Sequence, residues 1–184
     1  MEKPVTLIIG LGQTVGDAIA RRFVDAHQGV VAVDPDKKLL EELGKTTGDK
    51  VILHHGDTHT RLGLRNALAV VLEAHGRIDN VICIPPLPEH ETLADLDMAA
   101  FEAFMARTLS ASVQALRVFA VEMAAHREDP SSAVDRARQA GTFTFVLSLG
   151  AEMAQSGWFS ESVSQHAVLG VVKAAAAELA RDRS

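Results

Sequence analysis

Three glycines lie close together near the N-terminus, in the segment Ile9-Gly-Leu-Gly-Gln-Thr-Val-Gly16. The segment joins an apolar run, typical of a strand, to a stretch with helical spacing of apolar residues. Unpaired N–H groups and the positive end of the helix dipole favour an anion at such a point. Gly10 permits a sharp turn, Gly12 lets a phosphate approach the backbone, and Gly16 lets the helix pack on the strand. The same pattern also occurs in ordinary tight turns, so it indicates a phosphate site only together with a second feature.

That second feature is Asp34, which ends the apolar run 30–33 about twenty residues later. A carboxylate at this point accepts the ribose hydroxyls of an adenosine and repels a 2′-phosphate. The glycines and Asp34 together predict a dinucleotide site that prefers NAD over NADP. Asp57 follows the next apolar run, where its carboxylate could hydrogen-bond an adenine amine or cap the helix that begins near Thr60. Both alternatives for Asp57 stay open.

Two other clusters of side chains contain the residue types of a metal site and of a hydrolytic triad, but their spacing disfavours both functions. His54, His55, Asp57 and His59 are residue types that bind zinc or iron, but adjacent residues of a strand point to opposite faces. We therefore expect these side chains to be ordinary polar residues of a loop, with no bound metal.

Ser148, Glu161 and His166 could form a hydrolytic triad. However, Ser148 has no nucleophile-elbow sequence, and His166 lies five residues after Glu161, on a different face of a helix. The triad is therefore disfavoured.

The elements that position these residues alternate between strands and helices. Apolar runs predict strands at 5–9, 30–33, 50–54, 78–84 and 142–149, and helical spacing predicts helices at 15–26, 36–43, 61–75, 98–126 and 160–182. Right-handed crossovers between such strands give an α/β fold, a Rossmann-like doubly wound parallel sheet with helices on both faces. We expect the strand order 3-2-1-4-5, in one domain over residues 1–184. The charged stretch 127–141 is predicted to be a loop, with a short helix at 132–139.

The composition of the chain limits its possible partners and its cellular compartment. The chain has 184 residues, 47% of them apolar, and a formal charge of −6 without a basic stripe, which argues against nucleic acid as a partner. The single cysteine, Cys83, allows no internal disulfide and indicates a reducing compartment. We expect its thiol to be a buried small apolar group. The apolar run at 5–9 is too short for a signal sequence or a membrane span, so we expect a cytoplasmic protein.

This order of elements resembles the short-chain dehydrogenase/reductase family over nearly the whole chain. The family's TGxxxGxG loop is matched at Gly10 and Gly16, while Ile9 and Thr14 replace its threonine and middle glycine. Its aspartate after the third strand falls on Asp57. Its NNAG sequence falls on residues 83–86, which share none of the four residues.

The resemblance places the family's catalytic serine at Ser148, its asparagine at Thr108, and its tyrosine and lysine at Glu161 and Gln165. In the family the tyrosine transfers the hydroxyl proton, and the lysine lowers its pKa and holds the nicotinamide ribose. A glutamate could act as a base, but it would repel an alkoxide, and Lys173 is two helical turns too far to help. The chain contains no tyrosine. The family also continues with a sixth and a seventh strand, without which the nicotinamide pocket would be open to water.

These features lead to three hypotheses. The first is a protein that binds NAD without the family's hydride transfer and acts as a regulatory, structural or partner subunit. The second is an active NAD-dependent oxidoreductase that uses Ser148 with Glu161 or water. The third is a protein whose nucleotide site no longer binds. Small residues on the helices 98–126 and 160–182 also predict a homo-oligomer, because the family forms its dimer through these two helices.

Overall fold

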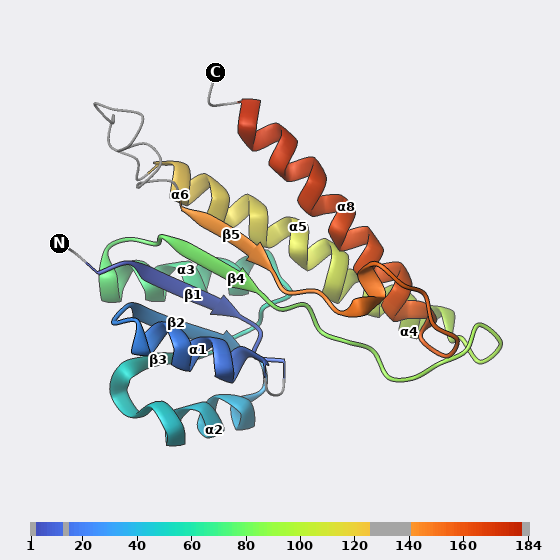
Figure 1. Cartoon of the computed structure of the whole chain (residues 1–184), viewed down its shortest axis with the longest axis horizontal. Helices are drawn as coiled ribbons and strands as arrows, with labels where there is room; N and C mark the ends of the chain where they lie inside the picture. The colour runs from blue at the N-terminus through green and yellow to red at the C-terminus, as the bar shows by residue number, and fades with distance from the viewer. Residues whose placement is uncertain (1–2, 13–14, 126–140, 182–184) are drawn as a thin grey trace.

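The computed structural model describes residues 3–12, 15–125 and 141–181. Five parallel strands form one sheet in the order β3-β2-β1-β4-β5 (Figure 1), which confirms the predicted doubly wound topology. The strands are β1 (Val5–Ile9), β2 (Gly29–Asp34), β3 (Val51–His55), β4 (Asn80–Cys83) and β5 (Thr142–Phe145). β4 and β5 are shorter than the runs 78–84 and 142–149 predicted, because pairing with their neighbours stops at Cys83 and Phe145.

Helices follow each of the first four strands, and one more follows β5. They are α1 (Val15–Asp25), α2 (Lys37–Thr47), α3 (Arg61–His75), α4 (Met98–Met105), α5 (Ala111–Ala115), α6 (Val121–Ala125) and α8 (Phe159–Arg181). The predicted helix 98–126 is helical from 98 to 125, but it contains two π-helical turns, η2 (Ala106–Ser110) and η3 (Leu116–Ala120). Short 3₁₀ turns are η1 (Gly48–Lys50) and η4 (Leu149–Ala151). Most of the stretch 127–141, with the short helix predicted at 132–139, lies outside the described residues.

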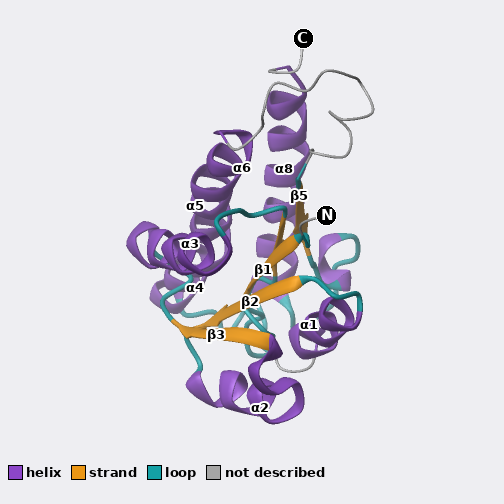
Figure 2. Ribbon diagram, turned by 90° about the vertical axis from the view of Figure 1, so that its left-hand side faces the viewer, coloured by secondary structure: helices purple, strands orange, loops and turns teal. Residues whose placement is uncertain are grey.

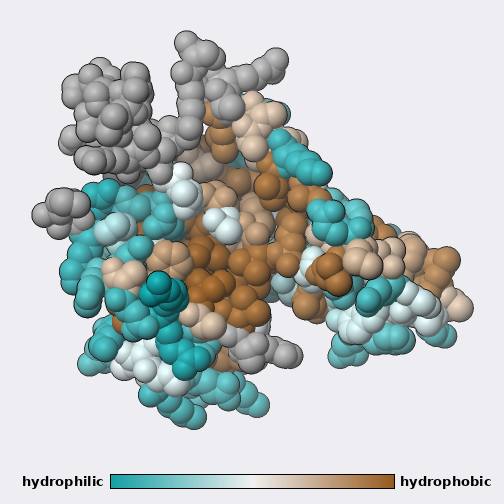
Figure 3. All heavy atoms as spheres, in the orientation of Figure 1, coloured by the Kyte–Doolittle hydropathy of each residue, from teal (hydrophilic) through white to brown (hydrophobic). Residues whose placement is uncertain are grey.

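Two apolar cores lie on opposite faces of the sheet. On one face, Ile8, Val30 and Ala32 pack with residues of α1 and α2. On the other face, Leu7, Val31 and Val81 pack with residues of α3, α5 and η3 (Figure 2). In Figure 1 no described helix crosses the viewer's side of β4 and β5, and a largely hydrophobic area is visible there in Figure 3. The sheet is therefore covered on both sides at β2 but on one side at β5.

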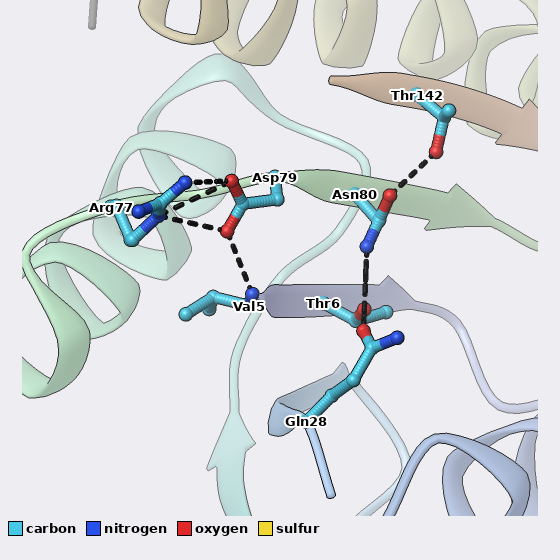
Figure 4. A network of polar contacts seen from close by, with 7 residues as sticks. All are labelled: Val5, Thr6, Gln28, Arg77, Asp79, Asn80 and Thr142. Carbon is cyan, nitrogen blue, oxygen red and sulfur yellow. Dashed lines mark hydrogen bonds and ion pairs between the residues drawn. The ribbon is translucent and has the colours of Figure 1, made fainter. Parts of the chain in front are cut away.

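Polar contacts at the amino-terminal ends of β1, β4 and β5 fix the register of these strands (Figure 4). Thr6, Asn80 and Thr142 are register partners, and the Asn80 side chain joins the other two at 3.1 and 2.7 Å. The Asp79 carboxylate accepts the Val5 N–H at 2.8 Å. A one-residue slip of β4 would break these bonds, so they hold β1, β4 and β5 in the register that aligns their carboxyl ends.

Candidate functional site

A cleft of about 1160 Å³ lies at the carboxyl edge of the sheet. It includes the point between β1 and β4 where the strand order reverses, which is where open α/β sheets bind ligands. Of the predicted site residues, those that line it are Gly10, Gly12, Asp34 and Ser148. Gly16, Asp57 and Glu161 are not among the lining residues.

The glycine loop adopts a backbone that side chains would not tolerate. Gly10 and Gly12 have φ values of +79° and +49°, and a Cβ at Gly10 would lie 2.5 Å from the Ile84 carbonyl oxygen. A Cβ at Gly16 would collide with the backbone of Leu11, whose carbonyl accepts the Gly16 N–H at 2.7 Å. Gly16 thus lets the first turn of α1 close onto the end of β1, as the sequence predicts.

Asp34 is bonded to the glycine loop itself. Asp34 is only 5% exposed. One of its carboxylate oxygens accepts the Leu11 N–H at 2.6 Å. The other oxygen accepts the Asp36 N–H at 2.7 Å. Each oxygen keeps a further acceptor site, so the carboxylate can still accept hydroxyl donors from the cleft. Asp34 therefore shapes the loop and lines the cleft at the same time.

Asp57 organises the start of α3. Its carboxylate accepts the His59 N–H and the Thr60 hydroxyl, both at 2.7 Å, while the Thr60 oxygen accepts the Gly63 N–H and caps the helix. Burial raises the pKa of Asp57, but the hydrogen bonds from His59 and Thr60 and the charge of His59 outweigh it, so the pKa lies below its ordinary value. The helix cap is thus Thr60, supported by Asp57, and Thr58 and His59 line the cleft in its place.

The rings of His55 and His59, near Asp57, contact different groups. The His55 ring contacts the Pro35 carbonyl at 3.0 Å, and the His59 ring lies 3.4 Å from the Asp57 carboxylate. Within the described ranges, no three His, Cys, Asp or Glu side chains are grouped so that they could hold a metal ion.

Ser148 brings together the three positions where the family resemblance places the serine, the tyrosine and the lysine. Its hydroxyl donates to the Glu161 carboxylate at 2.5 Å and accepts the Gly150 N–H at 3.1 Å. Its N–H donates to the Gln165 side-chain oxygen at 3.1 Å. The His166 ring contacts the Ser162 carbonyl on the exposed side of α8, so it does not complete a triad with Ser148.

Polar groups on α8 and η2 are deeply buried and incompletely paired. Gln165 and Thr108 are both 0% exposed, and neither the Gln165 amide nitrogen nor the Thr108 hydroxyl has a partner among the described residues. Thr108 lies in the π-helical turn η2, which packs against α8, and such turns often occur at functional sites. The buried stripe of α8 consists of Ser160, Ser164, Gln165 and Val168, which is mainly polar. Hydrophobic periodicity gave no signal for that stripe.

Cys83 takes no part in this chemistry. Its thiol ends β4 and is 7% exposed, and burial raises its pKa from 9.0 to about 12. The thiolate that a nucleophile requires is therefore scarce at neutral pH, as the prediction of a buried apolar group implies.

Sequence reasoning missed one wall of the cleft, the segment 85–91, which we call the proline strap. It follows β4 and is held against the start of α8 by three contacts. The Glu91 N–H donates to the Gly157 carbonyl at 2.9 Å, and the Glu91 carboxylate accepts the Ser160 N–H at 3.1 Å. The ring of His90 meets Trp158 edge to face at 5.4 Å. Three prolines in four residues were the available signal, because they stiffen a chain that leaves the sheet.

Fold and site together define a Rossmann-type α/β protein with a ligand cleft at the strand ends. The family model described as short chain dehydrogenase matches residues 4–183. The chain therefore belongs to the short-chain dehydrogenase family, as the resemblance of its sequence predicts.

Similar proteins include Short-chain dehydrogenase reductase 5 of Arabidopsis thaliana, which is 27% identical over 98% of this chain and 66% of its own length. The sex determination protein tasselseed-2 of Zea mays is 27% identical over 97% of this chain and 52% of its own length. The chain thus spans about half to two thirds of these relatives.

Solved structures show the same fold. A 3-ketoacyl-(acyl-carrier-protein) reductase from Brucella melitensis, complexed with NADH, superposes with a TM-score of 0.85 at 22% identity, over 98% of this chain and 72% of that one. A short chain dehydrogenase/reductase from Burkholderia phymatum in complex with NAD superposes with a TM-score of 0.81 at 19% identity, over 94% of this chain and 59% of that one.

In the part of the chain that the structure describes, helices are too short or too polar to cross a membrane.

Proposed function

We propose that this chain binds NAD in preference to NADP at the carboxyl edge of the sheet, and that it lacks the hydride-transfer activity typical of its family. It then acts as a regulatory, structural or partner subunit. The observation that carries the proposal is the contrast between the intact unit of Asp34 with the glycine loop and the carboxylate at Glu161. Two solved relatives are complexed with NADH and NAD, which supports a nicotinamide dinucleotide as the ligand.

The residues of the cleft fit such a ligand. The positive φ of Gly12 and the absence of a side chain leave its backbone open to a phosphate group. Asp34 keeps acceptor sites for ribose hydroxyls, and its negative charge repels a 2′-phosphate. When bound, the dinucleotide supplies a hydride donor or acceptor.

The catalytic half does not provide the matching proton. The Ser148 hydroxyl gives its hydrogen to Glu161, so the hydrogen is not free for a substrate carbonyl. A carboxylate at Glu161 cannot donate a proton, and it repels the negative oxygen that forms when a ketone is reduced. Gln165 carries no charge to offset that repulsion.

Fluorescence titration of the full chain with NADH and NADPH tests the nucleotide site. We expect wild-type protein to bind NADH roughly tenfold more tightly than NADPH, since a carboxylate close to a 2′-phosphate costs about 1 kcal/mol or more. In Asp34→Asn the ratio of the two affinities should fall towards one. Asp49→Asn, in the exposed turn η1, is the control that keeps the ratio. Because both cofactors are compared on one variant, a loss of stability does not imitate the result.

Equal affinity of wild-type protein for both cofactors would refute the preference for NAD. Absence of binding by either cofactor at millimolar concentration would instead favour a nucleotide site that no longer functions. The proposed loss of activity is tested separately. Protein that binds NADH should not oxidise it in the presence of simple ketones above the rate of buffer.

One contact favours a second candidate function, NAD-dependent oxidation of an alcohol. The 2.5 Å bond between Ser148 and Glu161 gives a path along which an alcohol proton could reach the carboxylate through the serine hydroxyl. Appearance of NADH with secondary alcohols, abolished in both Ser148→Ala and Glu161→Gln, would establish this function and remove the first proposal.

We also propose that the chain is a homo-oligomer through the helices 98–126 and 160–182. α8 packs beside α4 and α5, which are consecutive parts of one long helix (Figure 1), and apolar side chains on this layer stay exposed, among them Val113 at 39% and Val163 at 37%. Light scattering coupled to size exclusion should give a multiple of the 19.7 kDa chain mass. A monomer at micromolar concentration would disprove the proposal. The cytoplasmic location stays a prediction from the sequence.

A further inference from the structure

One wall of the cleft is a single stripe of α4 and η2. Ala100, Phe101, Phe104 and Arg107 all line the cleft, and their spacing places them on the same helix face. Phe104 is 5% exposed, and the ring centre of Phe101 lies 6.1 Å from that of Phe159. This wall is therefore apolar along two turns and ends in a guanidinium group.

The facing wall combines apolar and polar residues. It consists of the proline strap, whose prolines and Leu87 are followed by Glu89, His90 and Glu91, together with the chain that follows β5 and Trp158. Arg107 is the one arginine or lysine among the described lining residues. Four carboxylates also line the cleft: those of Asp34, Asp36 and Glu91 accept backbone N–H groups, and Glu89 lies on the proline strap. Arg107 is exposed and forms no hydrogen bond or ion pair within the described ranges.

A second polar group in the cleft also lacks a partner. Ser160 lines the cleft at the start of α8, is 2% exposed, and its hydroxyl has no hydrogen-bond partner among the described residues. Buried hydroxyls are nearly always paired, so an unpaired one in a cleft indicates a bound water or ligand oxygen. Arg107 and Ser160 come from two helices that pack together, since α8 contacts both α4 and η2.

From these observations we infer that the cleft takes an apolar compound bearing a carboxylate. The guanidinium of Arg107 binds the carboxylate, the Ser160 hydroxyl donates to a ligand oxygen, and the hydrocarbon part lies against Phe101 and Phe104. Arginine fits a carboxylate in particular because its planar fork can donate two parallel hydrogen bonds. The inference rests on the proposed function, since it names the class of second ligand that shares the cleft with NAD.

The probes for the test are 4-phenylbutyrate and its neutral amide, titrated calorimetrically into the full chain. We expect wild-type protein to bind the acid roughly tenfold more tightly than the amide, as a charge-assisted hydrogen bond contributes about that factor. Arg107→Gln should bind both compounds equally. Arg117→Gln is the matched control, because Arg117 is also exposed on the same helical segment but lies outside the cleft lining. Melting curves establish that both variants are folded.

NADH titrations of the same samples separate this inference from the proposed function. If wild-type protein does not prefer the acid, or if Arg107→Gln retains the preference, the inference is wrong even when NADH binds. If NADH does not bind but the preference for the acid is lost only in Arg107→Gln, the carboxylate site stands and the proposed nucleotide site fails.

Discussion

The two halves of the cleft use their polar groups in different ways. At the end of β1 and β2, Asp34 bonds the backbone N–H groups of Leu11 and Asp36. At the end of β5, Ser148 bonds the side chains of Glu161 and Gln165, which lie on a different element. The first half is thus held by contacts of one side chain to backbone N–H groups, and the second by contacts to side chains of α8.

This difference shows which part of the site can change during divergence. A glycine loop with positive φ and a carboxylate that holds it tolerate few substitutions, because each change strains the backbone. Side-chain pairs can be replaced by other pairs that satisfy the same groups. The bonds of Ser148 to Glu161 and Gln165 are of this kind, and the family resemblance places the tyrosine and the lysine at these two positions of α8.

The largest effect should follow a change in the backbone-held half. In Gly16→Ala the new Cβ would collide with the Leu11 backbone, so we expect a loss of more than about 3 kcal/mol of stability and a melting temperature roughly 10 °C lower. Gly170→Ala in α8 is the matched control, because a Cβ there meets no atom within 4 Å. It should stabilise the protein by up to about 1 kcal/mol. Similar melting temperatures for both variants would contradict the proposed packing of α1 on β1.

The next effect concerns β4, which lies between the two halves. Burial raises the pKa of Cys83 from 9.0 to about 12, so at pH 8 the thiolate is about a thousandfold scarcer than in the unfolded chain. We expect native protein to react with a thiol reagent at least that much more slowly than protein in denaturant. Equal rates would mean that the end of β4 opens readily and that the two halves are not joined by a stable strand.

The topology and the backbone geometry of the glycine loop could be predicted from the sequence because their signals are local. Short apolar runs fix the strands, and Gly10 and Gly16 occupy backbone positions that few other residues can occupy. The contacts of the second half depend on tertiary packing. Nothing near Gln165 in the sequence indicates that its amide accepts the N–H of Ser148, 17 residues earlier.

The end of β5 and the place of Arg107 in a wall of the cleft could not be predicted either, because both depend on contacts that the local sequence does not show. Propensity extends β5 to Leu149, but Ser148 accepts the Gly150 N–H and starts a 3₁₀ turn instead. Helical spacing places Arg107 on the same face as Phe101 and Phe104. Only the packing of α4 and η2 against α8 determines that this face lines the cleft.

A smaller effect is expected from the half held by side chains. Ser148→Ala leaves the Gly150 N–H and one Glu161 oxygen without a partner, which should cost about 1 to 3 kcal/mol. Ser110→Ala is the control, because Ser110 is exposed and its side chain caps no helix. Chemical denaturation measures both variants. If Ser148→Ala is as stable as wild type, water replaces the hydroxyl and the half is more open than the contacts indicate.

The smallest effect tests the support of the nucleotide half at Asp57. Its folded pKa lies below the ordinary 3.8, so its contribution is present above about pH 4 and is lost as the pH falls through the folded pKa. The side chain is 48% exposed, and solvent screening limits the contribution to less than about 1 kcal/mol. Denaturation curves of Asp57→Asn should therefore show a small loss at pH 7 that shrinks towards pH 3. A loss that does not diminish as the pH falls below 3.8 would mean that the amide disturbs the cap at Thr60 by its shape rather than through the lost charge.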